Sequence, residues 1–321
     1  MDERFVTPGF DDFPLNLHRA MLDDRLRLRS FRQAIIARVR PGDTVVDIGT
    51  GTGVLAFMAH LAGAGRVVAF DRSAIVETAD RVRKLNFPDA AIEFHHLDVL
   101  TERLPRVKAD VLICELIGNF GLEENIIPII RRARGRLLKP GGHIVPGQME
   151  LLFGPVQTAA VHAEMEAWAK PIGGVDYSPF QDLAYNRVYH VDGERMTLLG
   201  KADALLSIDF ASVMERPRKL SGRFPIDRAG TLHGIASWFR AMLSPGNQLQ
   251  SDPRTASTHW GQVFFPIGEP VRVRPGAVVE FDLSMSRGRE AHIYRWEGAV
   301  YAQPRDRSPL RFSRESRDLL Y

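Results

Sequence analysis

Cysteine is nearly absent from the sequence, since Cys114 is the only one among 321 residues. A single cysteine cannot form a disulfide within the chain, and a chain of this length can bury a sufficient core without crosslinks. We therefore expect a protein of a reducing compartment, the cytoplasm. Residues 2–4 are all charged, which is not the pattern of a secretory signal.

Long apolar runs and blocks of one charge are missing as well. No run approaches the roughly 20 apolar residues that span a bilayer, so we expect no membrane partner. The 42 basic residues are balanced by 39 acidic ones, and no Lys/Arg block marks a nucleic-acid-binding tail, so we expect no nucleic-acid partner. With 45% hydrophobic and 25% charged residues, the chain has the composition of an ordinary globular protein.

The first part of the chain alternates between helical and strand-like patterns. Helical apolar spacing occupies residues 18–40, and further helical patterns follow each of several short apolar runs. The strand-like runs are 44–48, 66–70, 92–96 and 111–115, and the later helical patterns are 54–64, 73–85 and 125–138. This alternation predicts an α/β fold with a doubly wound, Rossmann-like parallel sheet.

The pattern changes near residue 147, where alternation with a period of two replaces the helical spacing. The strand-like runs there are 204–210, 232–243, 261–267, 271–274, 279–285 and 291–302. They predict an antiparallel sandwich or barrel, interrupted by a helical excursion at about 160–190. We therefore divide the chain into an N-terminal helical segment (1–40), a Rossmann-like domain (41–147) and an antiparallel domain (148–321).

A glycine-rich turn follows the first strand-like run. Gly49, Gly51 and Gly53 join this run to a helix, a geometry that lets the backbone approach an anionic ligand group, although a plain tight turn has the same pattern. Asp71 ends the next strand, where an acid usually binds ribose hydroxyls. Asp47 precedes the glycines and would repel a phosphate. It suits a ligand with an ammonium group, such as S-adenosylmethionine.

Three further acids follow in the Rossmann-like domain. Asp98 is placed to accept a hydrogen bond from an adenine amino group, and a solvated loop acid is the alternative. Glu115 ends a buried strand, and Glu124 follows nine residues later across a loop. Two carboxylates at one sheet edge match the planar fork of a guanidinium. Two surface acids near a helix start would give the same pattern.

These motifs together resemble the catalytic domain of protein arginine methyltransferases. The shared features are Asp-Ile-Gly-x-Gly-x-Gly at 47–53, the strand-end Asp71, and Cys-Glu-Leu-Ile-Gly-x5-Glu at 114–124. Thr258-His259-Trp260 matches the family's Thr-His-Trp loop, and the helix around residues 18–27 is similar to the family's first helix. The resemblance covers about residues 16–302 in one order, and it implies a Rossmann-like domain followed by an antiparallel β-barrel domain with a dimerisation arm.

The resemblance also implies roles for individual residues. The N-terminal segment would cover S-adenosylmethionine, with the cofactor contacts provided by His18, Met21, Arg27, Asp47, Gly49, Gly51, Asp71 and Asp98. Glu115 and Glu124 would hold the substrate guanidinium, and His259 would pair with Asp24. Trp260 would wall the substrate pocket. Without the resemblance, His259 and Trp260 read as ordinary core residues. No metal ion is implied.

The sequence departs from the family pattern around the acidic loop. Two tyrosines of the family would fall within residues 8–13 and are absent, while Leu116 and Asn119 replace aromatic residues. Glu123 replaces a tyrosine and adds a third acid beside the substrate. We expect a homodimeric enzyme that methylates arginine in a protein. Free arginine or another small guanidino compound is the alternative substrate, and a non-catalytic scaffold is the remaining alternative.

Overall fold

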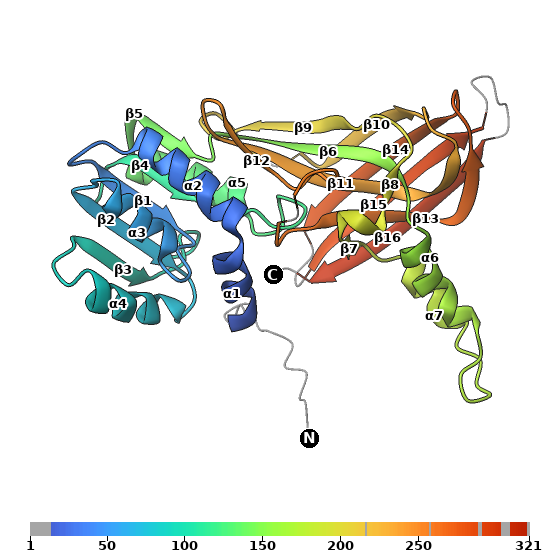
Figure 1. Cartoon of the computed structure of the whole chain (residues 1–321), viewed down its shortest axis with the longest axis horizontal. Helices are drawn as coiled ribbons and strands as arrows, with labels where there is room; N and C mark the ends of the chain where they lie inside the picture. Colours follow the sequence, from blue (N-terminus) through green and yellow to red (C-terminus); the bar gives the residue numbers. More distant parts are fainter. Residues whose placement is uncertain (1–13, 216, 257, 288–290, 303–308, 320–321) are drawn as a thin grey trace.

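The computed structural model describes residues 14–215, 217–256, 258–287, 291–302 and 309–319. Within them the chain forms a parallel sheet with helices and, beside it, a larger antiparallel part from which a helical arm projects (Figure 1). The positions of the missing family tyrosines, residues 8–13, lie outside the described residues. In the described part of the chain, no helix has the length and apolar character needed to cross a membrane.

The parallel sheet has five strands in the order β3-β2-β1-β4-β5. They are β1 (Thr44–Ile48), β2 (Arg66–Asp71), β3 (Ile92–His96), β4 (Ala109–Cys114) and β5 (Leu138–Val145). The predicted doubly wound sheet is confirmed. The strand order reverses between β1 and β4, and a crevice at the carboxyl ends of strands opens at such a switch point in α/β folds.

The helices of this half are α1 (Leu15–Asp23), α2 (Arg25–Arg38), α3 (Val54–Leu61), α4 (Ile75–Asn86) and α5 (Ile126–Leu137). The single helix expected over 18–40 is wrong, because the chain breaks between α1 and α2 at Asp24. The Asp24 carboxylate accepts a hydrogen bond from the Arg27 backbone N–H at 2.9 Å and so caps α2. Apolar spacing continues across the break, so periodicity could not reveal it.

The antiparallel part begins at residue 148, and its predicted character is confirmed. Its strands are β6 (Gln148–Gln157), β7 (Tyr189–Val191), β8 (Thr197–Leu198), β9 (Asp203–Asp209), β10 (Lys219–Pro225), β11 (Gly230–Ser244), β12 (Asn247–Gln250), β13 (Gln262–Val273), β14 (Val278–Arg287), β15 (Ala291–Tyr301) and β16 (Leu310–Leu319). They form two sheets, β7-β13-β11-β6-β8 and β10-β14-β15-β16, with β9 and β12 paired at the side of the first. Among the described residues, no pairing closes the two sheets into one barrel.

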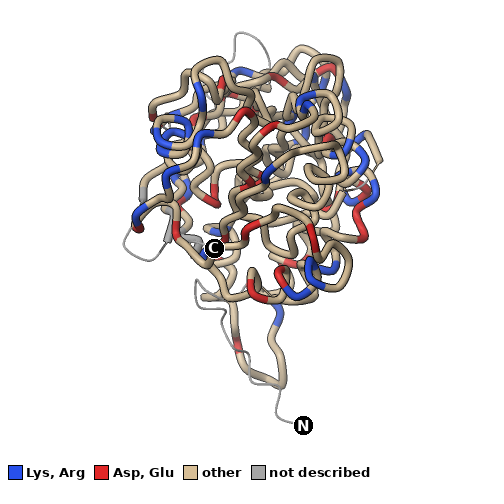
Figure 2. Tube along the Cα trace, turned by 90° about the vertical axis from the view of Figure 1, so that its left-hand side faces the viewer, with Lys and Arg blue, Asp and Glu red and all other residues tan. Residues whose placement is uncertain are grey.

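Two short helices, α6 (Ala159–Glu166) and α7 (Pro179–Tyr185), form the arm expected at 160–190. The arm leaves the body of the molecule (Figure 1). Its exposed apolar side chains are Trp168, Ile172, Val175, Phe180 and Leu183. Seen from the end that carries the parallel sheet, basic and acidic residues are intermixed (Figure 2). The exposed apolar side chains named above give the arm an apolar surface.

Candidate functional site

The glycine-rich turn after β1 lies at the carboxyl edge of the parallel sheet. Gly49, Gly51 and Gly53 all have left-handed backbones, with φ of 69°, 51° and 84°. The Gly49 and Thr50 N–H groups donate to the Phe70 carbonyl at 2.9 and 3.0 Å, so the turn is fixed against β2. The residue types are therefore required by the turn geometry, and the turn presents backbone rather than side chains to the crevice.

Asp47 carries an unsatisfied carboxylate in this crevice. Its side chain is fully buried, and one oxygen accepts a hydrogen bond from the Thr50 hydroxyl at 2.7 Å. The other oxygen has no hydrogen-bond partner among the described residues. Burial raises the pKa of Asp47 to about 7. A cationic ligand group would satisfy the second oxygen and restore the ionised form, which is what an ammonium group offers.

The other predicted cofactor acids shape the backbone around them. Asp71 accepts hydrogen bonds from the N–H of Gly51 at 2.8 Å and from Ser73 N–H at 2.9 Å. Asp98 accepts from Leu100 N–H at 2.7 Å. His18 is buried and lies over Gly51, and its burial lowers the imidazole pKa. The structure gathers these residues at one edge of the sheet, and their cofactor roles stay predictions.

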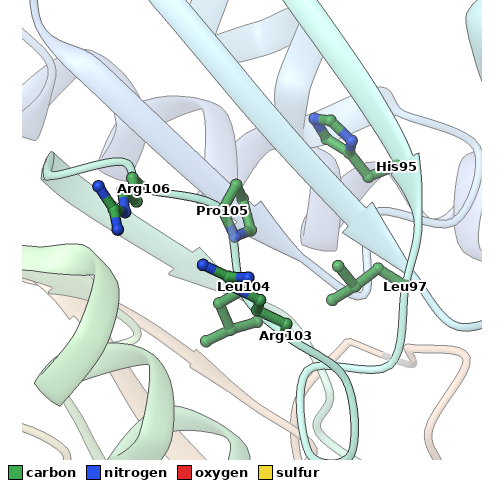
Figure 3. A pocket seen from close by; sticks show the side chains of 6 residues that line it. All are labelled: His95, Leu97, Arg103, Leu104, Pro105 and Arg106. Carbon is green, nitrogen blue, oxygen red and sulfur yellow. The ribbon is translucent and has the colours of Figure 1, made fainter.

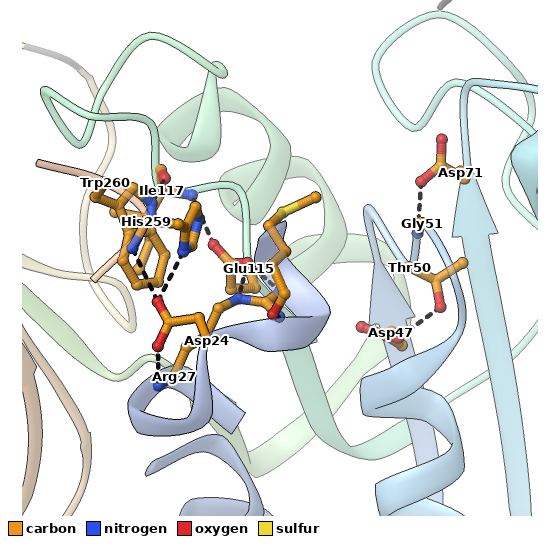
Figure 4. Close-up of polar contacts among 11 residues, drawn as sticks. Asp24, Arg27, Asp47, Thr50, Gly51, Asp71, Glu115, Ile117, His259 and Trp260 are labelled. Carbon is orange, nitrogen blue, oxygen red and sulfur yellow. Dashed lines mark hydrogen bonds and ion pairs between the residues drawn. The ribbon is translucent and has the colours of Figure 1, made fainter. Parts of the chain in front are cut away.

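Arg27 and Glu115 form a buried ion pair at the centre of the site (Figure 4). Nε of Arg27 donates to one Glu115 oxygen at 2.9 Å, and Nη2 donates to the same oxygen. Nη1 donates to the Met21 carbonyl at 3.3 Å. Only 6% and 5% of the two charged side chains are exposed. Glu115 is thus shaped and placed to accept a guanidinium, and in the chain alone that guanidinium belongs to Arg27.

Glu124 is the second acid of the pair, and its surroundings disfavour the ionised form of its side chain. Burial is the largest cause that raises its pKa to about 8, and the neighbouring Glu115 and Glu123 contribute to the same shift. No hydrogen bond or ion pair of Glu124 to another described residue is present. Glu123, expected at the substrate, directs one oxygen back to the Phe120 N–H at 2.7 Å. A cation between Glu115 and Glu124 would relieve this repulsion.

The Thr-His-Trp segment reaches the site from the antiparallel part. The His259 ring Nδ1 and backbone N–H both lie against one Asp24 oxygen, at 2.9 and 3.1 Å. Burial raises the pKa of Asp24, but hydrogen bonds from His259 and from the Arg27 N–H outweigh it and hold that pKa below its usual value. The buried Trp260 indole donates to the Ile117 carbonyl of the acidic loop (Figure 4). The Thr-His-Trp segment therefore connects the start of helix α2 with the loop between Glu115 and Glu124.

Phe120 is a site-shaping residue that the sequence analysis missed. Its ring meets Phe153, Phe265 and Tyr294 edge-on, with ring centroids 6.0, 5.8 and 5.8 Å apart. The acidic loop is thereby anchored in the aromatic core of the antiparallel part. An apolar aromatic within a loop of acids and glycines was the available signal.

A separate hollow of about 410 Å³ lies between β3 and the loop that follows it (Figure 3). Its lining residues are His95, Leu97, Arg103, Leu104, Pro105 and Arg106. It shares no lining residue with the predicted site. Within the described residues, no three His, Cys, Asp or Glu side chains are grouped so that they would hold a metal ion.

Comparisons with known proteins cover both halves of the chain. Residues 149–294 match the family model of the arginine methyltransferase oligomerization subdomain, and residues 29–151 match that of ribosomal protein L11 methyltransferase. Protein arginine N-methyltransferase 6 of Xenopus laevis is 30% identical over 288 residues, which are 85% of this chain and 84% of that protein. Protein arginine N-methyltransferase 1 of Saccharomyces cerevisiae is 27% identical over 84% of this chain and 80% of that protein.

Solved structures give the same fold. The Trypanosoma brucei PRMT1 enzyme–prozyme heterotetrameric complex with AdoHcy matches with a TM-score of 0.84 at 22% identity, over 95% of this chain and 99% of that chain. Protein arginine methyltransferase 10 of Arabidopsis thaliana matches with a TM-score of 0.80 at 23% identity, over 94% and 98%. The likeness therefore includes the parallel sheet, the antiparallel part and the arm.

Proposed function

Because this chain belongs to the protein arginine N-methyltransferase family, we propose that it transfers a methyl group from S-adenosylmethionine to a guanidino nitrogen of arginine in a protein. The observation that carries this proposal is the buried Glu115, which already holds a guanidinium, that of Arg27. Glu124 lies close enough for the Glu115 charge to raise its pKa, so the second carboxylate is a neighbour of the first.

The crevice fits the cofactor by its own chemistry. The unpartnered, buried oxygen of Asp47 suits the ammonium group, and the left-handed turn with Gly49 and Gly51 follows it in the chain. The remaining contacts are proposed for Asp71 on the ribose, Asp98 on the adenine, Arg27 on the carboxylate, and His18 and Met21 as the cover. When bound, S-adenosylmethionine supplies an electrophilic methyl group on a positively charged sulfur.

The chain's acids prepare the substrate. A guanidinium is charged at any cellular pH and is a poor nucleophile. Glu115 and Glu124 localise its positive charge on the nitrogens they bind, which leaves more electron density on the third nitrogen. Holding that nitrogen about 3–3.5 Å from the methyl carbon supplies most of the acceleration. Arg27 must release Glu115 before a substrate guanidinium takes both carboxylates.

Two groups are placed to take the proton that the methylated nitrogen loses. Glu124 is one, because in this arrangement its carboxylate is ionised once the guanidinium is bound and lies within hydrogen-bond reach of the group that loses the proton. His259 is the other, and its hydrogen bond to Asp24 orients the ring. The pH dependence of turnover in an Asp24→Asn variant separates the two routes, since only the second uses Asp24.

The experiment that tests the function offers three acceptors with labelled cofactor. They are an Arg/Gly-rich peptide, the same peptide with lysine in place of arginine, and free arginine. We expect label and the added mass of a methyl group on the arginine peptide alone. Label on free arginine alone would make the small guanidino compound the substrate, and no transfer to any acceptor would favour a scaffold. Leu116, Asn119 and Glu123 are the positions where this chain's substrate preference would differ from the family's.

We further propose that two copies of the chain associate through the arm. The apolar side chains exposed on it, Trp168, Phe180 and Leu183 among them, need a partner surface, and the matched subdomain is described as an oligomerization subdomain. Within each copy we assign residues 1–40 to covering the cofactor, residues 41–147 to binding it and residues 148–321 to holding the substrate. Light scattering should give the mass of a dimer for the wild-type chain, and of a monomer for a Trp168→Ser/Leu183→Ser variant. A monomeric wild-type chain contradicts the proposal.

A further inference from the structure

Helix α5 holds the loop after β3 through one arginine. Nη1 of Arg132 donates to the Leu100 carbonyl and Nη2 donates to the Glu102 carbonyl, both at 2.6 Å. A guanidinium has the planar fork that two carbonyls of one turn require, whereas a lysine ammonium is a single point donor. Arg132 therefore fixes the position and the orientation of this loop relative to α5.

The loop held by Arg132 carries one of the proposed cofactor contacts, Asp98. The loop follows β3, and its first residue, Leu97, donates its N–H to the Asp71 carbonyl at the end of β2 at 2.7 Å. Its turn is closed by Asp98, whose backbone N–H donates to the Glu102 carboxylate at 2.8 Å and whose own carboxylate accepts from Leu100 N–H at 2.7 Å. The turn therefore moves as one unit with Asp98.

Two hollows border the loop, and apolar side chains pack it against the core. One side borders the hollow of about 410 Å³ described above (Figure 3). A second hollow, of about 360 Å³, lies beside Arg132 and is lined by Leu100, Pro128, Arg131 and Arg132. Val99 is buried, and the half-buried Leu97 and Leu104 pack against the core. The two hydrogen bonds of Arg132 add the polar contacts that orient the turn relative to α5.

The start of α5 follows Glu124, the second acid of the pair. Asn125, with a left-handed φ of 60°, precedes the helix and turns the chain from Glu124 into it. The buried side chains of α5 lie along one stripe against the sheet, and they are Ile126, Ile127, Ile130, Ala133 and Leu137. A helix packed in this way moves as a rigid body, so a displacement felt at Arg132 reaches Glu124.

We propose that Arg132 is a positioning residue that couples cofactor binding at the Asp98 turn to guanidinium binding at Glu124. The inference rests on the proposed function and deepens it. Coupling between two sites is reciprocal, so bound cofactor tightens substrate binding by the same factor as bound substrate tightens cofactor binding. We expect a factor of about 10 in the wild-type chain, within the usual range for coupled sites.

The test measures this factor by calorimetry. An Arg/Gly-rich peptide is titrated into the full chain with and without saturating S-adenosylhomocysteine. The variants are Arg132→Ala, Arg132→Lys and a matched control, Arg136→Ala. Arg136 is exposed on the same helix and has no hydrogen bond or ion pair to the described residues, so its removal changes the charge of α5 equally. Thermal unfolding is recorded for every variant.

We expect Arg132→Ala to lower the coupling factor to below about 2, Arg132→Lys to retain part of it, and Arg136→Ala to leave it at the wild-type value. A fold that is merely weakened would reduce the melting temperature without removing the coupling. A wild-type coupling factor in Arg132→Ala overturns this inference alone. So does a wild-type chain that binds both ligands and methylates the peptide but shows no coupling. A wild-type chain that neither binds S-adenosylhomocysteine nor methylates overturns the proposed function instead. If Arg132→Ala fails to fold, Arg132→Lys carries the test, and unchanged coupling in it contradicts the need for a forked donor.

Discussion

Replacing Asp47 with asparagine should stabilise the chain while it weakens the cofactor site. Asparagine has the shape of the carboxylate and still accepts the hydrogen bond from the Thr50 hydroxyl, which is 2.7 Å away in the wild-type chain. It carries no charge, so it avoids the cost of ionising a fully buried group. It also offers an ammonium group no counter-charge, so affinity for S-adenosylmethionine should fall.

The size of the effect follows from the pKa of Asp47, which burial raises from 3.8 to about 7. Each unit of pKa difference corresponds to about 1.4 kcal/mol, so a difference of about three units gives an upper value of about 4 kcal/mol. Because the folded-state pKa is raised, the folded chain holds the proton more tightly than the unfolded chain. This contribution to stability is complete below about pH 4 and is lost as the pH rises through about 7.

The free energy of unfolding of Asp47→Asn should therefore equal that of the wild type near pH 4 and exceed it by about 2–4 kcal/mol near pH 8. For a chain of this size the gain corresponds to a melting temperature about 3–6 °C higher. Differential scanning calorimetry of the ligand-free chains measures it, with the exposed Asp89→Asn as the control. Equal stability of variant and wild type at pH 8, or unchanged affinity for the cofactor, would refute the assignment of Asp47.

Two further predictions concern the acids around the substrate. The pKa of Glu124 is about 8 in the ligand-free chain, and a bound guanidinium should lower it. Peptide binding near pH 7 should therefore release about one proton. Calorimetry in buffers of different ionisation enthalpy should detect this release in the wild type and not in Glu124→Gln. Asp24→Asn should keep the cap on α2 and lose only the charged partner of His259, lowering kcat with little change in melting temperature. Asp24→Ala should cost about 1 kcal/mol more, since the cap is lost too; equal melting temperatures of the two variants would contradict the capping role.

Local patterns sufficed for the sheet and for much of the site. Short apolar runs ending in an acid or a glycine located β1 and β4, and parallel strands present their carboxyl ends on one edge. Asp47, Gly49 and Glu115 therefore fall together without any knowledge of side-chain contacts. The sequence analysis did not predict strand β6, because its residues are buried on both faces and apolar and polar side chains do not alternate along it.

Local sequence patterns could not predict contacts between residues that are far apart in the sequence. The Arg27–Glu115 pair spans 88 residues, and nothing local to either residue indicates the other. The break between α1 and α2 at Asp24 depends on a side-chain cap that lies within continuous apolar spacing. The packing of Phe120 depends on aromatic rings from three distant segments of the chain. The pairing of His259 with Asp24, implied only by the family resemblance, is present in the structure, whereas its role in catalysis stays a prediction.

The central claim is that Glu115 and Glu124 together hold a substrate guanidinium, and Glu115→Gln tests it most directly. The neutral amide keeps the shape of the side chain but removes half of the charge that the cation meets. Methyl transfer to an Arg/Gly-rich peptide should fall at least about 100-fold, the loss typical of removing one electrostatic contact from an active site. Affinity for S-adenosylhomocysteine, measured on the same preparation, should stay within about threefold of the wild type, because the glutamine amide oxygen still accepts the hydrogen bond from Arg27, the proposed contact of the cofactor carboxylate. Near-normal turnover in this variant would contradict the claim.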